Sequence, residues 1–112
     1  MFQLEVTFDD PGLGKLCESE KELRRKWGAI RAKKIQARIT QLRGAETLED
    51  MRSLPGRCHE LREDLAGHLA VDLDQPWRLL FRPRDETEPS AGGGLDWSRV
   101  TAVVITSIVD YH

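Results

Sequence analysis

The sequence predicts an α+β domain in which helices cover one face of a single β-sheet. Residues 2–8 alternate apolar and polar side chains, as a half-buried strand does. Residues 19–43 then place apolar side chains at helical spacing, and from residue 57 onward short apolar runs alternate with turn-forming residues. We therefore expect one twisted, mostly antiparallel sheet. Its first and last strands should pair in parallel, because the helical layer supplies the crossover.

The helices are expected between the first strand and the rest of the sheet. A short helix is predicted over about residues 12–17. The long helix over 19–43 has Ser19 as its N-cap with Glu22 as capping-box partner, and Gly44 is its natural stop.

The long helix has an interruption and a basic edge. Gly28 weakens it and is a candidate position for a kink. The apolar side chains expected to pack on the sheet are Leu23, Trp27, Ile30, Ile35, Ile39 and Leu42. Arg31, Lys34 and Arg38 fall together on the helical wheel beside this stripe, so they flank whatever the helix packs on.

The remaining elements alternate with turns. A short helix is expected over 47–53, with Thr47 as its N-cap. The predicted strands cover about residues 57–61, 68–73, 76–82 and 100–110. Residues 84–97 are acidic and rich in Gly and Pro, which predicts a flexible surface loop. The whole chain, 1–112, is expected to form one domain.

Composition limits the function classes. No apolar run approaches the roughly 18 residues of a membrane span, and no signal peptide is evident, so we expect a cytoplasmic protein. The net charge of -2 conceals an asymmetry, since residues 15–44 hold ten basic residues against three Glu and carry +7, while the rest carries -9. A basic helical segment on an acidic domain favours an anionic partner on one face, although a merely solvated helix face has the same composition.

Candidate catalytic groups lie near the end of the chain. Asp110, Tyr111 and His112 follow a buried strand, and strand alternation sends the Asp and His to one face and the Tyr to the other. His59 lies on an earlier strand. Side chains of these types can orient a hydroxyl, remove its proton and protonate a leaving oxygen. The two cysteines lack metal-ligand spacing and no nucleophile or phosphate-loop motif is present, so we expect acid–base chemistry without metal or cofactor.

Arg78 interrupts an apolar strand. It must reach the exposed face of the sheet or pair with an acid, and a guanidinium in that position is also suited to bidentate contact with a phosphate. Trp77 and Trp97 are candidates for stacking on a base, with core packing as the alternative that their large area favours.

These motifs, taken in order, resemble the RelE/ParE superfamily of type II toxins, and within it the HigB-like plasmid maintenance killer proteins. The resemblance covers nearly the whole chain. It rests on "LP" before a strand containing "HEL", on a hairpin entering "PWRLLF", and on the terminal "DYH". It implies a RelE-like fold and a ribosome-dependent mRNA endonuclease that cleaves mRNA in the ribosomal A site and is inhibited by a cognate, HigA-like antitoxin.

The resemblance also implies residue roles. His112 and His59 would be the acid–base groups, Tyr111 would position the nucleotide or share proton transfer, Asp110 would orient an imidazole, and Arg78 would stabilise the phosphorane. In this interpretation the basic helix, with Arg31, Lys34 and Arg38, contacts ribosomal RNA.

Two features depart from the family pattern and leave alternatives open. Many relatives carry a further Arg where this chain has Asp72, and many are basic overall. One alternative is therefore a degenerate domain that retains only antitoxin binding. Another is a toxin-fold protein that acts by binding, as gyrase-poisoning ParE-like relatives do, although binding alone does not require a terminal imidazole.

Overall fold

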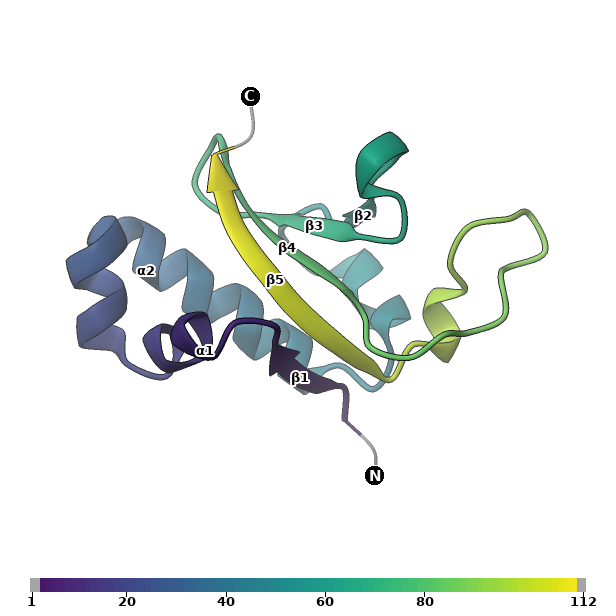
Figure 1. Ribbon diagram of the computed structural model, residues 1–112, viewed down its shortest axis with the longest axis horizontal. Coiled ribbons are helices and arrows are strands. Elements are labelled where there is room, and N and C mark those ends of the chain that lie inside the picture. Colours follow the sequence, from purple (N-terminus) through teal and green to yellow (C-terminus); the bar gives the residue numbers. More distant parts are fainter. Residues whose placement is uncertain (1–2, 111–112) are drawn as a thin grey trace.

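A five-stranded mixed sheet organises the chain in the computed structural model, which describes residues 3–110 (Figure 1). The strands are β1 (Glu5–Phe8), β2 (His59–Glu60), β3 (Leu69–Asp72), β4 (Trp77–Pro83) and β5 (Ala102–Asp110). Their order across the sheet is β1-β5-β4-β3-β2. β1 pairs with β5 in parallel and the other neighbours are antiparallel, which confirms the α+β class and the predicted pairing of first and last strands.

The helices follow the first strand, as predicted. The α-helices are α1 (Pro11–Cys17) and α2 (Glu20–Gly44), and the 3-10 segments are η1 (Leu48–Ser53), η2 (Glu63–Leu65) and η3 (Trp97–Arg99). In Figure 1, α2 passes behind the sheet. The predicted cap is present, since Ser19 Oγ accepts a hydrogen bond from the Glu22 amide at 3.2 Å. None of the helices described is long and apolar enough to cross a membrane.

Gly28 divides α2 into two helical pieces. Its φ of 85° and ψ of 164° are far from helical values, and glycine adopts them without steric cost. Leu23 and Ile35 would lie about 120° apart on one regular helix, yet both are fully buried. The kink therefore lets both pieces present an apolar side to the core. The expectation for Ile30 was wrong, because this side chain falls off the stripe of the second piece and is 73% exposed.

One face of the sheet packs against α2 and η1. Its fully buried strand residues include Val71, Leu79, Phe81 and Ile105, which join the helix side chains in a single core cluster. The pairing alternates strictly along β3 and β4, so neighbours such as Asp72 and Arg78 belong to the opposite face. We call that opposite face the outer face.

Two predicted elements differ from the structure for local reasons. β2 is only two residues long rather than 57–61, because Arg57 has a φ of 49° and so cannot continue an extended strand. The segment predicted as a helix over 47–53 is a 3-10 helix without the expected side-chain cap at Thr47. Asp50 instead accepts a hydrogen bond from the Glu46 amide at 2.9 Å.

Gly56 packs where no other residue fits. It has a φ of 112°, and a Cβ built there would lie 2.6 Å from Val71 Cγ2 and 2.8 Å from Arg38 Nε. Its carbonyl also accepts a hydrogen bond from the Asp72 amide at 2.7 Å. The turn before β2 is therefore pressed directly onto the end of β3.

Replacing Gly56 with Ala is expected to lower the free energy of unfolding by about 2–4 kcal/mol, because strain in φ adds to overpacking. Urea unfolding measures this change. Gly67→Ala is the matched control, since Gly67 has a similar φ of 90° but open space around it. Equal losses in the two variants would mean that backbone strain alone operates at Gly56.

Candidate functional site

His59, Asp72 and Arg78 share the outer face of the sheet. His59 pairs with Ala70 and Asp72 pairs with Arg78. Residues two apart on a strand point to the same side, so Ala70 and Asp72 lie on one face of β3. Their cross-strand partners, His59 and Arg78, lie on that same face of the sheet. The fold thus places two of the predicted site residues, His59 and Arg78, on a common surface.

Asp72 is the centre of a charged cluster on this face. Its carboxylate lies 3.3 Å from Arg78 Nε, in an ion pair whose side chains are only 17% (Arg78) and 10% (Asp72) exposed. The same carboxylate accepts hydrogen bonds from Arg57 Nε at 2.8 Å and from Gln75 Nε2 at 3.2 Å. Of the alternatives that the sequence allowed for Arg78, pairing with an acid is the one observed, and that acid occupies the position where relatives were expected to carry Arg.

Arg38 reaches the same point from the helix side. It is buried, and its Nε donates a hydrogen bond of 2.7 Å to the carbonyl oxygen of Asp72. With only 7% of its surface exposed, Arg38 has a structural contact in the fold. Its role as a ribosomal contact stays a prediction.

Arg31 is also committed within the protein. Its guanidinium donates two hydrogen bonds of 3.0 Å to Asp74 and stacks over the Trp77 ring at 4.1 Å from its centroid. Trp77 is thus covered on this side by a cation instead of being open to a base. Of the predicted RNA contacts on the helix, Lys34 is the one whose side chain is exposed.

The His59 imidazole has a defined tautomer when neutral. Its Nδ1 lies 2.7 Å from the carbonyl oxygen of Arg57. A carbonyl oxygen only accepts hydrogen bonds, so Nδ1 carries the proton and donates it. The lone pair of the neutral ring is then on Nε2. This arrangement suits His59 to accept a proton from a hydroxyl.

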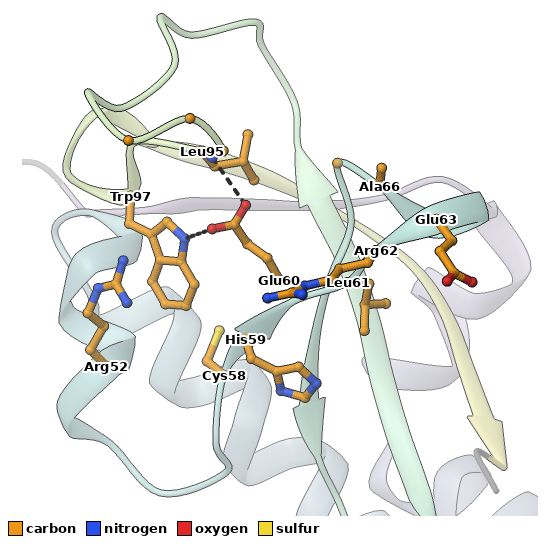
Figure 2. A pocket seen from close by; sticks show the side chains of 14 residues that line it. Arg52, Cys58, His59, Glu60, Leu61, Arg62, Glu63, Ala66, Leu95 and Trp97 are labelled. Carbon is orange, nitrogen blue, oxygen red and sulfur yellow. Dashed lines mark hydrogen bonds between the residues drawn. The ribbon is translucent and has the colours of Figure 1, made fainter.

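A cavity of about 710 Å³ opens beside β2 (Figure 2). Its walls come from η1, from β2 and the residue before it, from η2 and from the 84–97 loop, and they include Arg52, Cys58 and His59. Glu60 closes one side, because its carboxylate accepts hydrogen bonds of 3.1 Å from the Leu95 amide and from Trp97 Nε1. These contacts tie the end of the predicted flexible loop to β2.

Trp97 has a structural role in this wall. It is 3% exposed, and the guanidinium of Arg52 stacks on its ring at 3.9 Å from the centroid. The ring is consequently not open to a nucleotide base. Core packing, the alternative that its area favoured, is the role observed.

The terminal candidates are only partly described. Asp110 pairs with Trp77, whereas its neighbour Val109 pairs with Arg78. By alternation, Asp110 is therefore directed to the helix side of the sheet and away from the outer face. Tyr111 and His112, the other two terminal candidates, lie outside the described residues.

Arg57 is the site residue that the sequence did not reveal. Its side chain contacts Asp72 while its carbonyl accepts from His59, so it links the two parts of the cluster. The hydrogen bond to Asp72 raises the pKa of its guanidinium. The available signal was the "PGR" turn directly before "CHEL", which marks a residue placed at a strand entrance.

Among the described residues, no group of three His, Cys, Asp or Glu side chains is placed to hold a metal ion. Comparison with protein-family models, with curated proteins and with solved structures finds no match for this chain. The arrangement on the outer face is therefore interpreted from its own chemistry.

Burial raises the pKa of Cys58, which lines the cavity, to about 12, and that of Cys17, at the end of α1, to about 11. At pH 8, a thiol with a pKa of about 12 has roughly a thousandth of the thiolate of one at the ordinary 9.0. We expect iodoacetamide to label Cys58 at least a hundredfold more slowly in the native protein than in urea.

The same shift predicts alkaline destabilisation. Because the folded pKa lies above the unfolded one, the contribution of Cys58 to stability is complete below pH 9 and is lost as the pH rises toward 12. Cys58→Ala should flatten that part of the stability profile. For the labelling experiment, iodoacetamide labelling of Cys58 that is as fast in the native protein as in urea would contradict the burial of this thiol.

Proposed function

We propose that this chain is the toxin of a type II toxin–antitoxin system with a RelE-like, HigB-like fold. In this proposal it is an mRNA endonuclease that acts in the ribosomal A site without a metal and thereby inhibits translation. Its inhibitor is a HigA-like antitoxin. The observation that carries the proposal is the outer face, where an imidazole with its lone pair on Nε2 accompanies a pair of guanidiniums.

The proposed chemistry is attack by a 2′-hydroxyl on the adjacent phosphate. His59 Nε2 takes the 2′-hydroxyl proton, a bond forms between O2′ and phosphorus, and the phosphorus–O5′ bond breaks. The products are a 2′,3′-cyclic phosphate and a 5′-hydroxyl. Arg78 stabilises the added charge on the phosphorane. In this proposal His112 gives a proton to the leaving O5′.

The cluster at the end of β3 supports a second candidate. Asp72 already neutralises part of the charge that a phosphate would require, since both Arg57 and Arg78 contact it. A domain that retains only antitoxin binding does not need to bind a phosphate, so it would tolerate this reduction of positive charge. Gyrase poisoning remains the third candidate, and it predicts DNA damage with intact mRNA.

His59→Ala is expected to abolish growth arrest on induced expression and to remove new mRNA 5′ ends on translated messages, because the base for the 2′-hydroxyl is lost. Loss of a general base typically costs about 10²–10⁴-fold in rate. His68→Ala is the matched control, since it removes an imidazole from the turn before β3, outside the cluster.

Circular dichroism must first show that both variants fold. His112→Ala and a chain lacking His112 complete the series and should behave like His59→Ala. Arrest that persists in all three would eliminate the acid–base roles, and arrest with DNA damage but unchanged mRNA would favour the gyrase candidate.

Lys34→Ala is expected to weaken co-sedimentation with ribosomes and to reduce the dependence of binding on salt by roughly one phosphate contact. The reason is that Lys34 remains exposed on the basic helix, whereas Arg31 and Arg38 are held internally. Lys15→Ala is the control, because it removes the same charge from α1. Identical salt slopes for Lys34→Ala and the unmodified protein would exclude this contact.

A further inference from the structure

The end of β3 gathers more positive than negative charge. Three guanidiniums, those of Arg38, Arg57 and Arg78, contact Asp72 through their Nε atoms. One of them contacts the backbone carbonyl, and the other two share a single carboxylate. The nearby Asp74 does not balance this excess, because it is matched by Arg31. Among the described residues, these three guanidiniums and the Asp72 carboxylate together carry a net charge of +2, which favours binding of an anion.

The two guanidiniums on the carboxylate differ in their access to solvent. The Arg78 side chain is 17% exposed, while the Arg57 side chain is 67% exposed although its Nε is held at 2.8 Å from Asp72. A guanidinium has five N–H donors in a rigid fork. Contact through Nε anchors Arg57 at the cluster while most of its surface faces solvent, so it can meet a ligand without a large rearrangement.

The position of Arg57 relative to His59 adds a second constraint. The Arg57 carbonyl fixes the His59 tautomer, and Arg57 itself is in the left-handed region with a φ of 49°. Its side chain contacts Asp72 while its carbonyl oxygen accepts the hydrogen bond from His59. The chain thus couples the cation that contacts Asp72 to the imidazole that carries the free lone pair.

We propose that Arg57 and Arg78 form a binding site for a phosphodiester of single-stranded RNA, and that Asp72 is an internal anion that competes with the phosphate for these guanidiniums. This inference rests on the proposed nuclease function and deepens it. It assigns the second phosphate contact to Arg57 on the turn before β2. It also assigns Asp72 a restraining role, since every contact that the carboxylate keeps is one that the phosphate must replace or share.

The test measures binding to the purified protein without ribosomes. One probe is a 2′-O-methyl oligouridylate, which has the phosphodiester backbone but no attacking hydroxyl, and the other is inorganic phosphate. Asp72→Asn should bind the oligonucleotide at least tenfold more tightly than the unmodified protein. Asp74→Asn is the matched control, because it removes the same charge two residues along the chain but releases only Arg31; it should change binding less than twofold.

Arg57→Gln tests the same site without disturbing the buried pair of Asp72 and Arg78. It should weaken oligonucleotide binding at least fivefold, whereas Arg99→Gln, an equal charge change on η3, should not. This variant decides the question if Asp72→Asn fails to fold. Equal affinities for Arg57→Gln and the unmodified protein would overturn the proposal, and so would binding of inorganic phosphate without binding of the oligonucleotide.

The outcome is separable from that of the nuclease proposal. Oligonucleotide binding in the predicted order by a protein that causes no growth arrest would retain the phosphodiester site and reject the nuclease. Growth arrest with cleaved mRNA, but with no effect of Asp72→Asn or Arg57→Gln on binding, would retain the nuclease and reject this site.

Discussion

The buried end of β3 holds four parts of the protein together through one residue. The Asp72 carbonyl oxygen accepts a hydrogen bond from Arg38 of α2, and the Asp72 amide donates one to the Gly56 carbonyl. Its carboxylate pairs with Arg78 of β4 and with Arg57 of the turn before β2. Removing one partner of a buried ion pair typically costs about 3–5 kcal/mol, because the other charge is left uncompensated. The sheet, the long helix and the turn before β2 therefore depend on the same set of contacts.

This dependence explains why the basic helix has less charge available to a partner than its composition indicates. Residues 15–44 carry a net charge of +7. However, Arg31 donates hydrogen bonds to the Asp74 carboxylate, and Arg38 donates one to the Asp72 carbonyl oxygen. Basic side chains at the edge of an apolar stripe can reach past it, and here they reach the turn between β3 and β4. Their charge therefore stabilises the fold beside the candidate site.

The two residues of β2, His59 and Glu60, are held by different partners. His59 is held by the Arg57 carbonyl on one side and by pairing with Ala70 on the other. Glu60, the next residue, anchors the 84–97 loop through Leu95 and Trp97. A two-residue strand thus connects the cavity to the charged cluster.

The sequence by itself determined the fold class and the start of α2, because the hydrophobic period and the Ser19 cap are local signals. It also indicated the parallel pairing of β1 with β5, because the helices between them supply the crossover. It also named His59 and Arg78, whose positions on strands follow from the same period. Only the tertiary structure decided that Asp72 pairs with Arg78, and that Arg57 contacts both Asp72 and His59. Those contacts depend on how the turn before β2 is placed against β3 and β4, and no local pattern records which acid a buried guanidinium will meet.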